Sequence, residues 1–570
     1  MNPDTRNLIA AICLSMSVLI GYQILFGEES NKNNIKNEQQ NVEKNNEPSI
    51  SLPKGKENTF LTEKTKKVKN IKRINIINDE IEGSISLLGA RLDDLTLKNY
   101  RKTIDPESDK IKFLRKIDEI NPYFIQFGWS SPNNQKVPNG NTIWNSSNTI
   151  LDPKSPIVLT WNNGEGLEFL QEISIDKNFM IKVVQKVKND TSNPVNLYPY
   201  GLIRRAGEPE TTDFFVLHEG PLGVFDGSLK EHSYSDLKES GQKGMSFNTN
   251  EKGGWIGITD KYWMAALIPD QKTNSNFTFR YVNNSVSYQT DYLGSLSKIP
   301  ANSEVKIESR VFSGAKRLDL LDKYEEDLKI KNFDLAIDFG WFYFLTKPFF
   351  YALSWANNIL GNFGLAILAI TVIVKIVFFP LANKSYKSMA RMRVLTPQLQ
   401  KLRERFGNDR QKMNMEMMAL YKREKVNPAA GCLPILVQIP VFFALYKVLF
   451  VSIEMRQAPF FGWIKDLSAL DPTSIFNIFG LLPYSTDFLP DFLNLGIWPL
   501  LMGTTMVLQQ RLNPKPPDPV QAQIFAWMPV VFTFLLATFP AGLVIYWTWN
   551  NLLSITQQWI ITRKINKEKS

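Results

Sequence analysis

An apolar run that contains a single lysine constrains this sequence more than any other feature. Residues 365–380 read LAILAITVIVKIVFFP, and Lys375 is their one charged residue. An ammonium within hydrocarbon costs about 2.5–3.5 kcal/mol on insertion scales. Taken alone, Lys375 has two interpretations. Its stem carries the charge to the interface near the helix end, or the charge serves a polar site within a membrane.

Further apolar runs of membrane-spanning length accompany this one. Residues 8–26 carry no charge, and the short basic region before them together with the missing cleavage signal favours an anchor over a signal peptide. The later runs lie near residues 351–382, 433–453, 493–508, 524–539 and 543–561. The sequence therefore predicts a multi-domain membrane protein with a polytopic bundle of six transmembrane helices, the last five forming its core.

A polar region separates the first run from the later ones. Residues 28–70 are rich in Asn, Lys and Glu and cannot bury enough apolar surface to fold, which predicts a flexible tether after an anchor at residues 1–27. Residues 71–332 contain short β-like runs at 81–88, 123–129, 156–161, 179–187, 254–258, 277–282 and 305–312. This pattern predicts a large antiparallel β-sandwich. Its histidines, His218 and His232, lack partners at metal-ligand spacing and are expected in loops or on the surface.

Residues 333–350 are dense in aromatic side chains, with Asp334, Asp338 and Lys347 as their charges. They fit an amphipathic helix lying in the interface, although the start of the next span is an equally good interpretation. We assign residues 333–350 to an interfacial helix, 351–563 to a membrane core, and 564–570 to a basic tail.

The basic residues predict the orientation of the chain. Residues 383–430 contain 12 lysines and arginines against four acids, and such an excess between apolar runs marks the cytoplasmic side before it suggests nucleic acid. Both termini, residues 384–425 and residues 511–523 are therefore expected in the cytoplasm. The β domain and residues 456–491 are expected on the outer side of the membrane, so the chain is predicted to be a multi-pass membrane protein.

The basic cytoplasmic loop has the composition of a helical hairpin. Residues 384–406 and 410–425 are rich in helix formers and are separated by a Gly-Asn-Asp turn. Six methionines lie in this loop. Their side chains either pack within the hairpin or form an adaptable surface that binds varied apolar partners.

Motifs of enzymes are missing from the chain. It has no glycine-rich nucleotide loop, no H-E-x-x-H, and no histidine in its membrane half. Cys13 and Cys432 predict neither a disulfide framework nor a metal–thiolate site. The inner parts of the apolar runs also lack the carboxylates of a cation-coupled transporter, and Lys447 lies near the outer end of its run, where it can reach the interface. No enzyme activity, cofactor or metal is expected, and no DNA partner.

Five segments of the membrane half carry a family resemblance. They read TVIVKIVFFPLANKSYKSMARMRVLTPQLQKLRERFGND (371–409), EMMALYKREKVNPAAGCLPILVQIPVFFALYKVL (416–449), EMRQAPFFGWIKDLSALDP (454–472), MPVVFTFLLATFPAGLVIYW (528–547) and NNLLSITQQ (550–558). In content and order they resemble the YidC/Oxa-type membrane protein insertases in their Gram-negative bacterial form. The resemblance implies a hydrophilic groove among the five later spans, open to cytoplasm and lipid and closed on the outer side.

The resemblance also implies roles for particular residues. The family's groove maps onto Lys375, Thr371, Gln438, Tyr546 and Trp547. The family carries an arginine where this chain has Lys375, so the charge is kept and the bidentate fork is lost. The apolar slide that meets an incoming span maps onto Pro440, Val441, Phe532 and Leu535. The implied contacts for the ribosome, targeting factors and Sec translocon components include Lys384, Arg391, Arg393, Lys401, Arg403, Arg405, Lys422 and Arg423.

The predicted function is insertion and assisted folding of nascent membrane proteins in the inner membrane, without nucleotide hydrolysis, alone or with the Sec translocon. An alternative is a small-anion channel or transporter that uses Lys375, although no inverted repeat is evident. A third possibility is an assembly scaffold in which Lys375 only reaches for the interface.

Overall fold

The computed structural model describes residues 71–569 except 147, 210, 212–216, 341, 407–408, 425, 427–432, 485, 487–488, 491–492 and 514–518. The predicted anchor at 1–27 and tether at 28–70 lie outside the described residues. Parts of the predicted outer segment at 456–491 and of the predicted cytoplasmic loop at 511–523 do so as well, as do the side chains of the tail from residue 565 onward.

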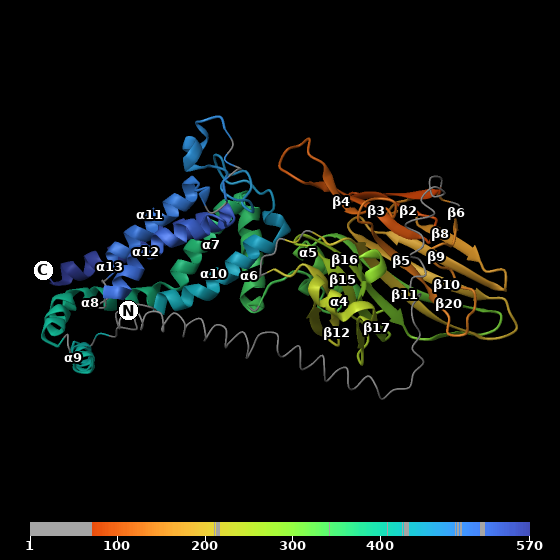
Figure 1. The fold of residues 1–570 in the computed structure, drawn as a ribbon, viewed down its shortest axis with the longest axis horizontal. Coiled ribbons are helices and arrows are strands. Elements are labelled where there is room, and N and C mark those ends of the chain that lie inside the picture. Colours follow the sequence, from red (N-terminus) through yellow and green to blue (C-terminus); the bar gives the residue numbers. More distant parts are fainter. Residues whose placement is uncertain are drawn as a thin grey trace. The chain divides into compact units, whose positions relative to one another are not determined.

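Eleven described strands form the first sheet of a β-rich domain (Figure 1). In sheet order they are β14 (Met245–Asn248), β17 (Ser275–Val282), β18 (Ser287–Gly294), β11 (Val195–Ala206), β5 (Tyr123–Ser130), β3 (Arg91–Arg101), β2 (Ile81–Ser86), β1 (Arg73–Ile77) and β7 (Ile150–Leu151), with β19 (Ser297–Ile299) beside β11 and β4 (Lys110–Leu114) beside β3. Among these described strands only β1 and β7 pair in parallel.

Nine described strands form the second sheet, and their pairings are antiparallel. In sheet order they are β13 (Ser228–Glu231), β12 (Gly220–Phe225), β15 (Trp255–Thr259), β16 (Trp263–Ile268), β20 (Ser303–Ala315), β10 (Met180–Asn189), β9 (Leu167–Ile175), β8 (Ile157–Asn162) and β6 (Asn145–Ser146). Burial alternates along most of β10, as it does when one face of a strand meets a core. Every segment predicted as a strand overlaps a strand, so the prediction of a β-rich domain is confirmed.

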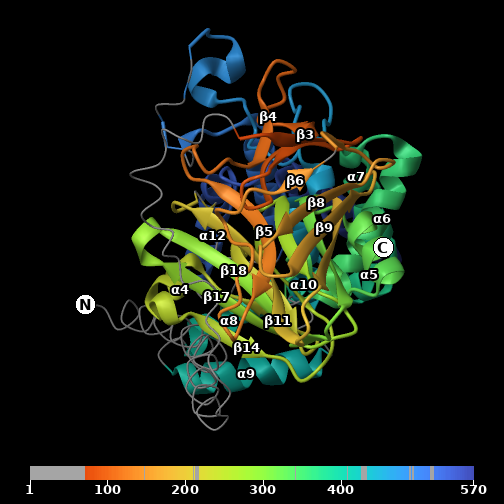
Figure 2. The same cartoon turned by 90° about the vertical axis from the view of Figure 1, so that its right-hand side faces the viewer.

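The two sheets pack face to face around a shared apolar core (Figure 2). Phe225 of β12 stacks on Phe277 of β17, with 4.5 Å between the ring centroids. Gln185 of β10 donates from Nε2 to the carbonyl oxygen of Gly128 in β5 at 2.8 Å. Apolar and polar side chains therefore both join the sheets, and the Gln185 Nε2 is satisfied across the interface, whereas its buried Oε1 has no hydrogen-bond partner among the described residues.

The two histidines of this domain lie in loops, as predicted, but neither is on the surface. His218 and His232 are both half-buried. His218 donates from Nε2 to the carbonyl oxygen of Pro221 at 3.1 Å, and His232 packs against the rings of Phe247 and Phe279. Among the described residues no group of His, Cys, Asp and Glu could hold a metal ion.

Helices make up most of the chain after β20 (Figure 1). Among the described residues the α-helices are α4 (Tyr234–Ser240), which precedes β20, and α5 (Leu318–Leu328), α6 (Tyr343–Leu360), α7 (Phe363–Val377), α8 (Phe379–Phe406), α9 (Arg410–Arg423), α10 (Leu433–Val451), α11 (Ile497–Leu512), α12 (Pro519–Leu536) and α13 (Ala541–Lys569), which follow it. Short 3₁₀ helices are η3 (Gly241–Lys243), η4 (Asn283–Ser285), η5 (Phe333–Ala336), η7 (Ile453–Met455) and η8 (Ile475–Gly480).

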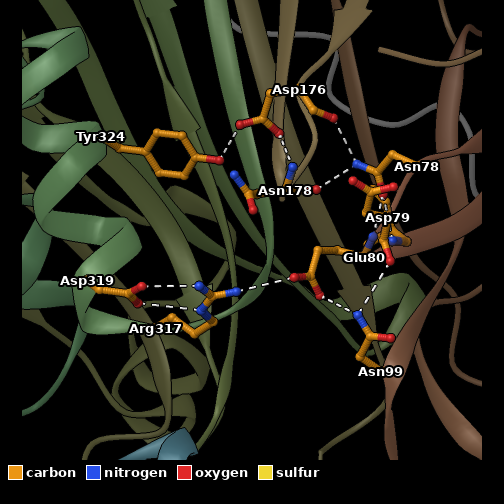
Figure 3. A network of polar contacts seen from close by, with 10 residues as sticks. Asn78, Asp79, Glu80, Asn99, Asp176, Asn178, Arg317, Asp319 and Tyr324 are labelled. Atoms are coloured by element: carbon orange, nitrogen blue, oxygen red, sulfur yellow. Dashed lines mark hydrogen bonds and ion pairs between the residues drawn. The ribbon is translucent and has the colours of Figure 1, made fainter. Parts of the chain in front are cut away.

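A network of polar contacts fastens α5 to loops of the β-rich domain (Figure 3). Arg317, which precedes the first turn of α5, donates from Nη1 to Glu80 at 3.2 Å. Tyr324 donates its hydroxyl to Asp176, and Asn78 donates from Nδ2 to the Asp176 carbonyl oxygen at 2.9 Å. By these contacts α5 belongs to the β-rich domain.

The boundary predicted between residues 350 and 351 falls inside a continuous helix. α6 runs from Tyr343 to Leu360 and ends at Gly361, whose φ of 68° stops the helix. Pro348 lies inside α6 without ending it, so the aromatic segment and the next run share one helix instead of forming two. Lys347 of α6 is ion-paired with Asp334 at 2.6 Å and Asp322 at 2.9 Å.

The apolar run predicted at residues 351–382 is divided among α6, α7 and α8. Among the described helices, none is by itself long and apolar enough to cross a bilayer. α7 and α8 reach that length and hydropathy only as a pair, bent by 68°. The number of transmembrane helices given by the sequence therefore stays a prediction.

Candidate functional site

A cavity in the helical region is lined by a mixture of polar and apolar side chains. Its lining is formed by Phe349, Ile370, Thr371, Val374, Lys375, Phe378, Leu381, Ala382, Tyr386, Gln438, Val441, Leu445, Tyr546, Asn550 and Gln557. These residues come from α6, α7, α8, α10 and α13, and from the break between α7 and α8. Among these described lining residues there is no Asp or Glu, and Lys375 carries the charge of the cavity.

Lys375 lies in the last turn of α7 and is only 8% exposed. Its Nζ donates to Ser554 Oγ at 2.7 Å, and Ser554 Oγ donates in turn to the carbonyl oxygen of Asn550 at 2.8 Å. Burying a charge is costly unless it is hydrogen-bonded. Here a neutral hydroxyl accepts from the ammonium, so the contact leaves the positive charge of the cavity in place.

α13 forms the wall opposite Lys375 because it is fastened to helices on two sides. Trp549 donates from Nε1 to the carbonyl oxygen of Leu368 in α7 at 3.2 Å. Asn551 donates from Nδ2 to Thr505 Oγ1 in α11 at 3.2 Å. These contacts fix the rotation of α13 and so decide which of its side chains reach the cavity.

Most of the residues predicted for the groove come together here. Those that line the cavity are Lys375, Thr371, Gln438 and Tyr546. Trp547 is not in the lining, and its ring packs against Phe442 at 4.5 Å between centroids. Successive residues of an α-helix point about 100° apart, so Tyr546 and Trp547 cannot both face one small cavity.

The residues predicted for the apolar slide are more dispersed. Val441 lines the cavity, whereas Pro440 and Phe532 are half-buried outside it. Leu535 of α12 is exposed. Of the predicted slide residues, Val441 therefore lies in the lining of the Lys375 cavity, whereas Leu535 lies on an exposed face of α12.

Sequence reasoning missed Ser554 and did not assign Asn550 or Gln557 to the site. The three residues are spaced i, i+4 and i+7 along α13, which places them on one helix face. Gln557 Oε1 is buried without a hydrogen-bond partner in the described part of the chain, and such atoms are normally satisfied by protein or water. This polar spacing in an apolar run was the signal that could have identified them.

α8 and α9 occupy the segment predicted as a helical hairpin. They pack through a small apolar cluster, Leu395, Leu399, Leu420, Tyr421 and Val426. The exposed cations among the predicted partner contacts are Lys384, Arg391, Arg393, Lys401, Arg405, Lys422 and Arg423, while the side chain of Arg403 lies outside the described residues. Of the methionines, Met389 is buried, whereas Met415 and Met418 are exposed.

Two family models match the chain on either side of residue 353. The model described as YidC periplasmic domain matches residues 73–352, which contain the β-rich domain. The model described as 60Kd inner membrane protein matches residues 355–568, which contain every residue that lines the Lys375 cavity except Phe349.

Curated relatives are similar over almost the whole chain. A membrane protein insertase YidC of Methylobacterium nodulans is 46% identical over 99% of this chain and 96% of its own length. A protein of the same name from Rickettsia bellii is 46% identical over 99% of this chain and 100% of its own length. Among solved structures, an active YidC insertase with its first transmembrane domain resolved covers 86% of this chain and 92% of its own, at 17% identity. The TM-score of this comparison is 0.35.

Proposed function

Because the chain belongs to the YidC family of membrane protein insertases, we propose that it inserts membrane proteins through the cavity around Lys375. It is an inner-membrane protein with a periplasmic β-rich domain and a helical region that follows it. Its substrates are nascent membrane proteins. Beyond the function of the family, we propose that the Lys375 cavity is the site of insertion and describe how it acts.

The observation that supports this site is the buried charge of Lys375 with a neutral partner. The polar groups around it let the outer tail of a substrate stay hydrated before it crosses. Lys375 attracts acidic residues of that tail, and the apolar walls strengthen the attraction because they lower the local dielectric constant. The apolar span of the substrate then leaves for lipid, with about 25 cal/mol gained per Å² of apolar surface removed from water.

The arrangement that we propose in the membrane has six spans with both termini in the cytoplasm. The exposed cations of the α8–α9 hairpin support a cytoplasmic position, since basic loops remain on that side. We propose that the same surface contacts the ribosome and targeting factors, and that the chain works alone or with the Sec translocon. The sequence has no nucleotide-binding loop, which supports insertion without nucleotide hydrolysis and a protein that is not an enzyme.

Photo-crosslinking from the cavity tests the proposed function directly. A crosslinker is placed at Thr371 or Gln438 of the full chain and exposed to ribosome-bound nascent membrane proteins. We expect adducts from both positions. The control is Ile560, which is exposed on α13 outside the cavity lining. Anion flux through reconstituted protein, without adducts at the cavity positions, would overturn the proposal in favour of a channel or transporter.

Substitution of Lys375 tests the role of its charge. Insertion of a substrate with an acidic outer tail should fall roughly 10- to 100-fold in Lys375→Ala, since a charge-assisted hydrogen bond is worth about 1.5–3 kcal/mol. Lys375→Glu should fall further because it repels the tail, and Lys375→Arg should retain insertion. A substrate with an uncharged tail is the matched control. Normal insertion in both the Ala and Glu variants would exclude charge attraction, and normal insertion in Ala alone would leave only a role in hydration.

A further inference from the structure

A loop between α10 and α11 exposes a cluster of large apolar side chains. Residues 472–484, here called the apolar loop, contain no Asp, Glu, Lys or Arg. Its exposed members include Ile475, Phe476, Ile478, Phe479, Leu481 and Leu482, and Leu481 is 80% exposed. Soluble surfaces rarely carry contiguous apolar patches of this kind, so the loop requires a partner that covers it.

Several polar backbone groups of the apolar loop are satisfied within the loop. The Phe479 amide donates to the carbonyl oxygen of Ser474 at 2.6 Å, and the Leu482 amide donates to that of Asn477 at 3.0 Å. Tyr484 donates its hydroxyl to the carbonyl oxygen of Phe476. Irregular backbone enters an apolar medium only if its hydrogen bonds are made internally, and these contacts meet much of that requirement.

The tip of the loop reverses through three residues with left-handed backbone. Ile478, Phe479 and Gly480 have φ values of 51°, 57° and 93°. Only glycine adopts this region without strain, and a β-branched residue there is an outlier. Local preference therefore does not select this conformation, and the contacts at the base of the loop have to hold it.

The base of the loop is fixed to α11 by one buried carboxylate. Asp471 accepts from the Trp463 Nε1 at 3.1 Å, from the Thr473 amide at 3.0 Å and from the Trp498 amide at 2.9 Å. The last of these is in the first turn of α11. The loop is thus presented rigidly from the end of an apolar helix.

The surroundings of the loop have the composition of a membrane interface. Phe461 and Trp463 are exposed beside its base, and Lys465 is exposed two residues further on. Aromatic rings and lysines gather at the level of lipid headgroups. α11 continues the exposed apolar surface through Leu501 and Leu508.

The contacts of the preceding segment place the loop on the same side as the β-rich domain. Arg456 donates to the carbonyl oxygen of Arg101, and its guanidinium lies 5.4 Å from the ring centroid of Trp263. The β-rich domain is periplasmic in this family. The leaflet next to the apolar loop is therefore the outer leaflet of the inner membrane.

We propose that the apolar loop is immersed in the outer leaflet of the lipid bilayer, with Lys465 at the phosphates. A lipid surface fits better than a protein partner because the exposed side chains of the loop are mainly apolar and none of its residues carries a charge that would select one protein. Insertion of such a segment is driven by its apolar area and stops at the headgroups. The inference rests on the membrane location of the family and not on the role of Lys375.

Fluorescence of a labelled loop tests this location in the full chain. Cys13 and Cys432 are replaced by serine, and an environment-sensitive dye is attached to Leu481→Cys in vesicles of phosphatidylethanolamine and phosphatidylglycerol. We expect blue-shifted emission, strong quenching by lipids with a spin label near the headgroup, and iodide quenching several-fold weaker than at the control Asp105→Cys, an exposed loop position of the β-rich domain. Leu482→Cys gives an independent second position.

Two outcomes would overturn the proposal. Iodide quenching at both loop positions equal to that at the Asp105 control would place the loop in water. Protection from iodide without quenching by spin-labelled lipid would assign the loop to a protein partner instead. Crosslinks from Gln438 to nascent chains, measured in the same labelled variants, separate this result from the proposed function. If the crosslinks from Gln438 are retained but the loop lies in water, only the loop inference is rejected. If the crosslinks are lost but the loop lies in lipid, only the proposed role of the cavity is rejected.

Discussion

Lys375 makes its described side-chain hydrogen bond to a hydroxyl, and this choice of partner matters for a site that receives carboxylates. A buried carboxylate in the place of Ser554 would neutralise the ammonium, and an incoming acid would have to displace it. Ser554 instead satisfies one N–H of the ammonium at 2.7 Å without cancelling its charge. The residue thus holds Lys375 in the cavity in a state that remains attractive to a substrate acid.

Ser554→Ala should lower the free energy of unfolding by about 1–3 kcal/mol, because it leaves a buried charged donor without this acceptor. The measurement is urea unfolding of the full chain in detergent. Thr556→Ala is the matched control, since Thr556 is exposed on the same helix and its hydroxyl makes the analogous bond to the Leu552 carbonyl oxygen at 2.9 Å. Equal losses in the two variants would contradict the assignment of a special role to Ser554.

The sequence indicated the role of a residue where that role depends on the properties of a single helix. It did not indicate the role where this depends on how two helices pack. The sequence indicates a site at Lys375 because a cation in an apolar run is costly by itself. Ser554 carried only the weaker signal of its helical spacing from Asn550 and Gln557, since a serine in an apolar helix is common. Its importance comes from the rotation of α13 against α7, which is fixed by Trp549 and other long-range contacts. The same rotation of α13 directs Tyr546 into the cavity and Trp547 against Phe442.

At the scale of elements, α10 is anchored at one end by an ion pair that the sequence did not show. The position of Lys447 near the outer end of its apolar run predicts that its ammonium extends to the interface. In the structure its Nζ lies 2.8 Å from Asp338 Oδ2, and both side chains are mostly buried. Gly340, with φ 68°, leaves room for it, since a Cβ there would lie 2.8 Å from Lys447 Cε. The pair fixes the helix that carries Gln438 and Val441 into the cavity.

A double-mutant cycle between Lys447→Met and Asp338→Asn should give a coupling energy of about 1–3 kcal/mol, as expected for contacting groups that are largely removed from water. The measurement is urea unfolding of the full chain in detergent for the four proteins of the cycle. The control cycle uses Lys102 and Asp109, which pair at 2.8 Å with both side chains exposed, and should give less than about 1 kcal/mol. A coupling no larger than that of the control would show that the pair does not anchor α10.

At the scale of the whole molecule, the β-rich domain and the helical region share one group of charged residues. Asp338 accepts from the amide of His218 at 3.0 Å as well as from Lys447. Lys316, at the end of β20, is buried nearby and donates to Thr259 Oγ1 at 2.8 Å. The sequence predicted both regions from local periodicity, but not this junction, because its members are far apart along the chain and lie in loops or at element ends.

This junction should make the β-rich domain sensitive to acid through His218. Burial lowers the pKa of His218 to about 4, an effect that the Pro221 carbonyl oxygen and Asp338 oppose and Lys316 reinforces. The unfolded chain, with a histidine pKa of about 6.5, therefore binds a proton between pH 6.5 and 4 that the folded chain does not. Stability is thus complete above pH 6.5 and falls as the pH drops toward 4, by at most about 3 kcal/mol.

His218→Gln keeps a donor for the Pro221 carbonyl oxygen and removes the titration. Unfolding of both proteins by urea at pH 7.5, 5.5 and 4.5 checks the expectation. We expect the stability of the variant to decline less on acidification than that of the parent chain, because the carboxylates common to both cancel in the comparison. The same decline in both would mean that His218 is protonated without cost in the folded chain, and that the acid sensitivity of the junction comes from its carboxylates.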